Sequence, residues 1–163
     1  MPLELIRIDE RLIHGQVVVG WGTRLGLSYY IVVDDALAAS GWEQELYRSA
    51  LPDGVVADFM TTEDAIRRFA ELDARHGAGA LLTRGTMTMR AIAEAGLLTG
   101  RRVNVGGLHD GEGRDRIADY LCLGPAERED LSVVLRSGAS VTGRDLPTAP
   151  VVPLDLADDA GGE

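Results

Sequence analysis

The sequence has no lysine, so all 16 of its basic residues are arginine. A chain without lysine lacks the phosphate-binding lysine of a P-loop, a lysine that could form a Schiff base, and the lysine of a receiver domain. Any phosphate chemistry must therefore depend on arginine, histidine, backbone N–H groups or a metal ion.

Cysteine is almost as scarce, since Cys122 is the only one. A single cysteine excludes an intramolecular disulfide, and its setting in "DYLCLG" predicts a buried strand. We interpret Cys122 as a small core residue rather than a nucleophile, because no histidine stands near it in the sequence.

Long apolar runs are also missing, and none approaches the ~20 residues that a membrane-spanning helix needs. The first residues, "MPLELIRIDE", carry acidic side chains where a secretory signal would have an apolar stretch. We therefore expect a cytoplasmic protein.

Positive charge is outnumbered, because 26 acidic residues give the chain a net charge of −10. This balance argues against nucleic acid as the main ligand. The 163 residues suit one domain over residues 1–163. A cluster of acids closes the sequence in "LDLADDAGGE", and we expect this tail to fray from about residue 154.

Apolar runs and helical patterns alternate along the chain. The predicted strands are 3–8, 29–33, 55–60, 79–83, 101–105, 119–123 and 139–144, and the predicted helices are 15–25, 41–50, 61–75, 86–96 and 125–138. This alternation predicts an α/β domain with a mainly parallel sheet and helices on both faces.

Polar residues gather where the predicted strands end. They are Asp9, Glu10 and Arg11 with His14 after the first strand, Asp34 and Asp35 after the second, Thr83 and Arg84 after the fourth, and Asn104, Gly106 and Gly107 with His109 after the fifth. Ligands of open α/β sheets bind outside the carboxyl ends of the strands, so we expect these loops along one edge.

His14 lies at the start of a predicted helix. The free N–H groups of Gly15, Gln16 and Val17 and the positive end of the helix dipole favour an anion there. Arg11, three residues earlier, offers a guanidinium that suits phosphate oxygens, and histidine can be a covalent nucleophile. On spacing alone, a capping or surface histidine is an equally good interpretation.

Two other clusters allow two interpretations each. Asp34 and Asp35 could form an acidic metal pocket, but consecutive acids after a buried strand are more often helix-start residues. Asn104, Gly106 and Gly107 could bring backbone N–H groups to an anion, or they could simply form a turn.

Several of these segments together resemble one family. "RIDERLIHGQV", followed by Trp21 and by "YYIVVDD", is similar to the start of the IIB component of the mannose/fructose/sorbose family of the bacterial phosphoenolpyruvate-dependent sugar phosphotransferase system. "VNVGG" and "RSGASVTGRDLP" resemble later segments of the same family. Two positions depart from its pattern: "LTRGT" stands where the family often has an Asn-Pro turn, and Asp34 where it often has asparagine.

The resemblance implies a fold, a mechanism and partners. The fold is a doubly wound, mainly parallel open sheet of about six to seven strands with helices on both faces. His14 would accept a phosphoryl group from the phosphohistidine of a IIA protein or domain and pass it to a sugar taken up by membrane IIC and IID subunits. Arg11 would neutralise the moving charge, and Asp9 would orient the loop or Arg11.

The resemblance implies neither a metal nor a nucleotide cofactor, and it places the protein at the cytoplasmic side of a membrane transporter. Gly15, Gln16, Val17, Asn104, Gly106 and Gly107 are the candidate phosphate-binding residues. The sequence names no sugar, and it leaves association into a homo-oligomer open.

Two other functions remain to be weighed. One is a regulatory phosphoprotein of the same fold, phosphorylated on His14 without a role in transport. The other is a metal-dependent hydrolase or a receiver-like domain that uses Asp9, Asp34 and Asp35. The absence of lysine counts against a receiver and against most enzymes that form a phosphoaspartate.

Overall fold

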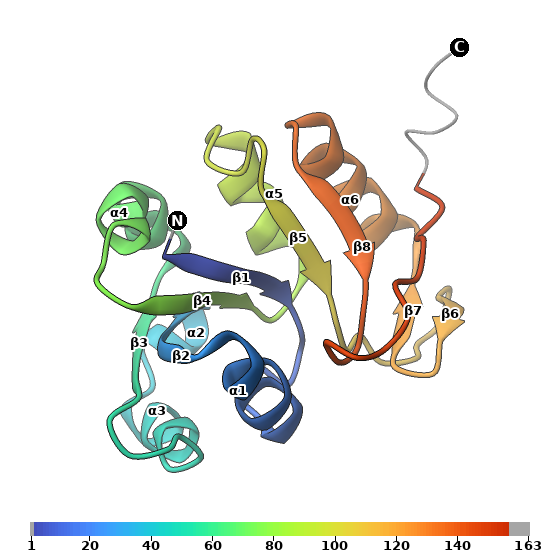
Figure 1. Cartoon of the computed structure of the whole chain (residues 1–163). Helices are drawn as coiled ribbons and strands as arrows, with labels where there is room; N and C mark the ends of the chain where they lie inside the picture. The colour runs from blue at the N-terminus through green and yellow to red at the C-terminus, as the bar shows by residue number, and fades with distance from the viewer. Residues whose placement is uncertain (1, 157–163) are drawn as a thin grey trace.

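Six strands form one open sheet in the computed structural model, which describes residues 2–156 (Figure 1). In spatial order they are β3 (Val56–Met60), β2 (Leu27–Val33), β4 (Ala78–Thr83), β1 (Leu3–Ile8), β5 (Arg102–Val105) and β8 (Ser140–Gly143). All neighbouring pairs are parallel. Because β1 lies inside the sheet, the chain winds first toward β3 and later toward β8, which confirms the doubly wound fold.

Helices cover both faces of this sheet. They are η1 (Gln16–Trp21, a π-helix), α1 (Gly22–Leu25), α2 (Asp35–Ala38), α3 (Gly41–Arg48), α4 (Thr62–Asp73), α5 (Thr86–Glu94) and α6 (Pro125–Arg136). One core lies under α4, α5 and α6, and the other lies under η1 and α2. The predicted helices on both faces are therefore confirmed (Figure 1).

Strand β2 shows how one apolar run serves both cores. Tyr29, Ile31 and Val33 belong to the core under α4, whereas Tyr30 and Val32 belong to the core under η1. Successive side chains of a strand point to opposite faces, so a strand between two layers of helices is apolar along most of its length.

The predicted strand at 119–123 does not join the main sheet. Only β7 (Leu121–Leu123) forms there, and it pairs antiparallel with β6 (Asp115–Ala118). The sequence did not predict β6 because it is only four residues long and begins with the exposed, charged Asp115 and Arg116. Cys122 in β7 is buried, as expected of a core residue.

Residues typical of helix termini lie at the end of α1 and at the start of α4. Gly26 follows α1 with a φ of 64°, in the left-handed region that glycine adopts without strain. Thr61 accepts a hydrogen bond from the backbone N–H of Asp64 and so caps α4. The short helix α2, with four residues, was not predicted.

After β8 the chain crosses the carboxyl edge of the sheet. Val152 forms an antiparallel bridge with Gly143, and Leu154 and Leu156 are buried in the core under α4. The expected frayed tail therefore packs as far as residue 156, and its remainder lies outside the described residues. Within residues 2–156, no helix has the length and hydrophobicity needed to cross a bilayer.

Candidate functional site

The loop that follows β1 is fixed at the carboxyl edge of the sheet. The N–H of Asp9 donates to the carbonyl of Thr83, at the end of β4, and the N–H of Glu10 donates to the carbonyl of Gly107, just beyond β5. A turn follows in which the N–H of Leu12 donates to the carbonyl of Asp9. Both neighbouring strands thus hold the start of the loop.

Leu12 occupies an unusual backbone conformation within this loop. Its φ is 54°, in the left-handed region that a branched side chain rarely adopts, and its side chain is fully buried. The carbonyl of Leu12 lies 3.0 Å from Nδ1 of His14. Strained residues of this kind persist where the surrounding structure fixes them, often at functional sites.

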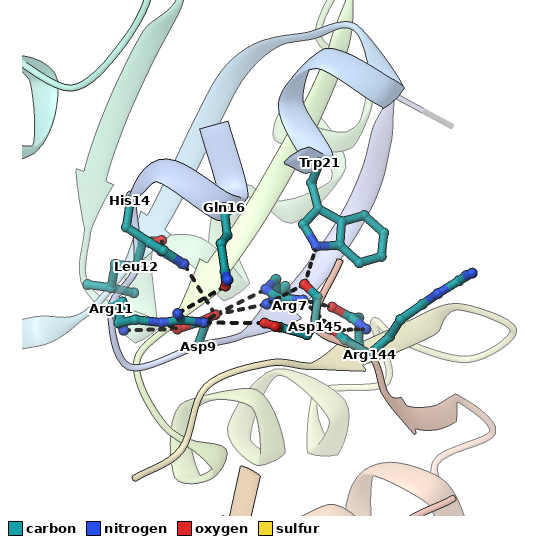
Figure 2. Close-up of polar contacts among 10 residues, drawn as sticks. Arg7, Asp9, Arg11, Leu12, His14, Gln16, Trp21, Arg144 and Asp145 are labelled. Carbon is teal, nitrogen blue, oxygen red and sulfur yellow. Dashed lines mark hydrogen bonds and ion pairs between the residues drawn. The ribbon is translucent and has the colours of Figure 1, made fainter. Parts of the chain in front are cut away.

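Asp9 is the centre of a buried ion cluster (Figure 2). Its Oδ2 accepts hydrogen bonds from Nη2 of Arg7 and Nη2 of Arg11, both at 2.9 Å, and its Oδ1 accepts from Nε and the backbone N–H of Arg11 at 2.9 and 3.0 Å. Burial raises the pKa of Asp9, but the hydrogen bond from Arg11 and the charge of Arg7 outweigh burial and hold that pKa below its usual value. The carboxylate therefore stays ionised.

Arg7 is the fully buried cation of the cluster. It projects from β1, is completely buried, and lies 5.4 Å from the centre of the Trp21 ring. Its guanidinium donates twice to Asp9, once to the side chain of Asn104, and once each to the backbone carbonyls of Arg144 and Asp145. Every N–H of the side chain has a partner, so Arg7 is positioned to hold Asp9.

Two glycines make room for these arginines. A Cβ on Gly106 would lie 2.2 Å from Nη2 of Arg7, and a Cβ on Gly107 would lie 2.9 Å from Nε of Arg11. Real Cβ atoms do not approach other atoms so closely. The glycine pair after β5 is therefore required by the close approach of the guanidinium groups.

His14 lies next to Asp9, with its side chain 18% exposed. Nε2 of His14 is 3.9 Å from Oδ2 of Asp9, is itself buried, and has no hydrogen bond among the described residues. Burial is the main cause that lowers the pKa of His14 below 6.5, so the ring is neutral at pH 7. A carbonyl can only accept, so Nδ1 donates to Leu12 and Nε2 keeps a free lone pair.

The residues after His14 start the helix η1. The N–H of Val18 donates to the carbonyl of His14, so the N–H groups of Gly15, Gln16 and Val17 precede the helical hydrogen bonds. Oε1 of Gln16 accepts a hydrogen bond from Nη1 of Arg11 at 3.0 Å. Gln16 therefore contacts the same guanidinium that Asp9 holds.

Comparison with known proteins identifies the family. A family model described as the PTS system sorbose subfamily IIB component matches residues 3–157. The chain belongs to this family. The N-acetylgalactosamine-specific phosphotransferase enzyme IIB component 1 of Escherichia coli K12 is 33% identical over 144 residues, which are 88% of this chain and 90% of that protein.

One further relative and a solved structure of the first relative agree with this assignment. The mannose-specific EIIAB component of E. coli K12 is 28% identical over 150 residues, which cover 92% of this chain and 46% of that protein. The crystal structure of the N-acetylgalactosamine-specific IIB component 1 of E. coli superposes with a TM-score of 0.85 at 31% identity, and the match covers 93% of this chain and 99% of that one. The chain is thus a component of the phosphotransferase system, with a phosphotransferase role.

The side chains of Asn104, Asp34 and Asp35 bind groups of the protein itself. Asn104 accepts from Arg7 and donates to the carbonyl of Arg144, so its side chain supports the ion cluster. Asp34 caps α2 through the N–H of Leu37, as the helix-start interpretation predicts, and Asp35 accepts from Thr62. Residues 2–156 contain no group of three side chains that could hold a metal ion.

Arg84 and His109 lie beside the loop after β1, where both contact Glu10. Arg84 is 3.5 Å from the carboxylate of Asp34 and donates to the carbonyl of Glu10, and His109 pairs with the side chain of Glu10. Together with Arg114 they line a surface hollow of about 580 Å³. The sequence assigns these residues no role, and the hollow is open and exposed.

Arg7 and Asp145 belong to the site although the sequence did not predict them. An arginine inside the apolar run "LELIRI" is a signal that could have identified Arg7, because an unpaired charge is not tolerated in a buried strand. Asp145 lies 3.8 Å from Nη2 of Arg11. Nothing in the local sequence of Asp145 indicates that it returns to the loop after β1.

Proposed function

We propose that this IIB chain is a phosphocarrier that is phosphorylated on His14. The observation that carries this proposal is a neutral histidine held within 3.9 Å of a carboxylate to which Arg11 is bound, at the carboxyl edge of a parallel sheet. A neutral imidazole has the free lone pair that a nucleophile needs.

In the proposed reaction, a IIA protein or domain donates the phosphoryl group. The N–P bond of the donor phosphohistidine breaks as a new N–P bond forms on His14, and the donor imidazole leaves with the electron pair. In a later step the N–P bond on His14 breaks as a sugar hydroxyl takes the phosphoryl group. The imidazole of His14 leaves with the electron pair, and the hydroxyl proton passes to solvent. The chain ends each cycle unchanged.

Arg11 supplies the positive charge that this transfer needs. Its side chain is 38% exposed, unlike that of Arg7, so its outer nitrogens can reach a phosphoryl group that arrives from solvent. The loose transition state of phosphoryl transfer depends on positioning and charge more than on a base, and a guanidinium suits its oxygens. Asp9 orients Arg11 through two parallel hydrogen bonds.

The position of His14 adds one step. Nε2 is buried and Nδ1 is hydrogen-bonded, so a phosphoryl group reaches a ring nitrogen only after the ring moves or exchanges its proton. The N–H groups of Gly15, Gln16, Val17 and Gly107 are the backbone donors proposed to hold the phosphoryl oxygens. The N–H of Gly106, a candidate from the sequence, instead donates to the carbonyl of Ile8 at 2.7 Å.

The name of the mannose relative, which joins A and B components in one protein, supports a IIA partner. We propose that the sugar is bound by membrane IIC and IID subunits and that this chain works at their cytoplasmic side, without a metal or nucleotide cofactor. The fold and loop leave the sugar undefined.

The experiment is transfer of labelled phosphate from a phosphorylated IIA protein, with the site mapped by mass spectrometry. We expect an acid-labile, base-stable phosphate on His14. His14→Gln should take up no label, and His76→Gln, which changes a histidine at the opposite edge of the sheet, should label like the unchanged chain.

Uptake of label by His14→Gln at the unchanged rate would refute the proposal. A second step adds membranes that contain IIC and IID together with the sugar. Loss of phosphate from His14 to the sugar supports the transport role, and a phosphate that stays on His14 favours a regulatory phosphoprotein instead.

A further inference from the structure

Asp145 reaches the loop after β1 from the far end of the chain, and the proposed reaction gives it no role. Its backbone carbonyl accepts hydrogen bonds from Nη2 of Arg7 at 3.1 Å and from Nε1 of Trp21 at 2.8 Å (Figure 2). Two buried donors thus fix the backbone of this residue. The direction of its side chain is a consequence of the fold and not of a flexible surface loop.

The carboxylate of Asp145 is only partly satisfied. Its Oδ1 is buried, has no hydrogen bond within the part of the chain that the structure describes, and lies 3.8 Å from Nη2 of Arg11. A buried carboxylate oxygen without a hydrogen bond is costly, and the charges of Arg11 and Arg7 offset part of that cost. The hydrogen bond to Asp9 is the main cause that raises the pKa of Arg11, and the charge of Asp145 raises that pKa further.

The charges of the cluster balance before any phosphoryl group arrives. Arg7 and Arg11 carry two positive charges, and Asp9 and Asp145 carry two negative ones. A phosphoryl group on His14 adds negative charge beside Asp9. Of the two cations of the cluster, Arg11 is partly exposed and Arg7 is fully buried. The phosphoryl group and Asp145 must then share the same guanidinium.

We propose that Asp145 is a positioning residue of the transfer reaction: its carboxylate competes with the phosphoryl group for Arg11 and so keeps phosphorylated His14 reactive. The inference rests on the proposed function of His14. A carrier that held its phosphoryl group too strongly would pass it on slowly. Removal of the negative charge of Asp145 therefore stabilises the phosphorylated form.

The test measures how long the phosphate stays on His14 in the full chain. The chain is phosphorylated with potassium phosphoramidate, the small-molecule donor is removed, and the loss of phosphohistidine is followed by ³¹P NMR at neutral pH. Asp145→Asn should slow this loss roughly fivefold, because one like charge several ångströms from the phosphoryl group has been removed. Asp53→Asn removes the same charge from an exposed turn at the opposite edge and should decay like the unchanged chain.

Two further variants separate charge from structure. Asp145→Glu keeps the charge and should restore the faster decay. Asp145→Ser removes the charge with a smaller side chain, so it replaces Asp145→Asn as the test if that variant does not fold. If Asp145 acts through Arg11, Asp145→Asn should have no effect on the decay in a chain that already carries Arg11→Gln.

The outcomes distinguish this inference from the function on which it rests. No label on the unchanged chain overturns both. Label on His14 with the same decay rate in the unchanged chain and in the folded, charge-removing variant of Asp145 overturns this inference alone. Slower decay that persists in the Arg11→Gln background also overturns it, because Asp145 would then act without Arg11.

Discussion

Replacement of Arg7 by methionine tests whether the buried ion cluster holds the loop after β1. Methionine fills a similar volume but removes the positive charge and all five N–H donors. We expect Arg7→Met to lower the free energy of unfolding by about 3 kcal/mol, the lower end of the range for breaking a buried ion pair. A typical domain is stable by about 5–15 kcal/mol, so the variant should remain folded.

The magnitude follows from what each partner of Arg7 keeps. The carbonyls of Arg144 and Asp145 retain second donors, from Asn104 and Trp21, respectively. The side-chain oxygen of the half-buried Asn104 loses its hydrogen bond from Arg7. Asp9 loses two charge-assisted hydrogen bonds from Arg7 but retains those from Arg11. Asp9 therefore keeps part of its hydrogen bonding, and the loss in the free energy of unfolding stays near the lower limit of about 3 kcal/mol.

The assay is urea unfolding followed by circular dichroism, at several pH values. In the unchanged chain the pKa of Asp9 is below 3.8, so Asp9 stabilises the fold above that pH and the stabilisation is lost as the pH falls through the lowered pKa. Without Arg7 the pKa of the buried carboxyl rises. Acid unfolding of Arg7→Met should therefore begin at a higher pH.

A matched control is Arg75→Met. Arg75 also pairs with an aspartate at 2.8 Å, but its side chain is 27% exposed and that of Asp58 is 45% exposed. This pair should contribute below about 1 kcal/mol, as surface ion pairs do. If Arg7→Met costs no more than Arg75→Met, or if its acid unfolding is unshifted, the reasoning about the buried cluster is wrong.

The remaining predictions concern transfer, packing and pH. Arg11→Gln should slow phosphorylation of His14 by the IIA donor ~100-fold in a quenched-flow assay, because the transferred group loses its main positive charge. An unchanged rate would exclude this role. Gly106→Ala should cost about 2 kcal/mol in urea unfolding, because its Cβ would lie 2.2 Å from Arg7, whereas Gly41→Ala, which meets nothing within 4 Å, should be neutral. Equal costs would contradict the packing argument. Because burial lowers the pKa of His14, the unfolded chain binds the proton first, and the unchanged chain should lose stability relative to His14→Gln as the pH falls below 6.5. Parallel stability curves would show that the ring is not buried as described.

Local sequence patterns predicted most of the secondary structure because burial repeats with a fixed period. Tyr29 to Val33 was recognisable as a strand between two layers, since no polar residue interrupts it. The hairpin of β6 and β7 was not recognisable, because β6 has only four residues, two of them charged, and depends on its pairing with β7. The sequence also did not show that η1 is a π-helix, because its apolar spacing matches that of an α-helix.

The sequence by itself limited any phosphate chemistry to arginine, histidine, backbone N–H groups or a metal ion, and it placed Arg11 and His14 three residues apart. It also determined the α/β class through the alternation of apolar patterns. These are local properties, which follow from residue type and spacing.

Only the tertiary structure decided what surrounds that loop. Arg7 meets Asn104 and the carbonyl of Asp145, which are 97 and 138 residues away along the chain. Those meetings require β1 to lie next to β5 and the segment after β8 to return across the edge of the sheet. Strand order is set by the packing of whole elements, and periodicity within one element carries no record of its neighbours. The roles of Arg7 and Asp145 therefore became visible only when the strands were in place.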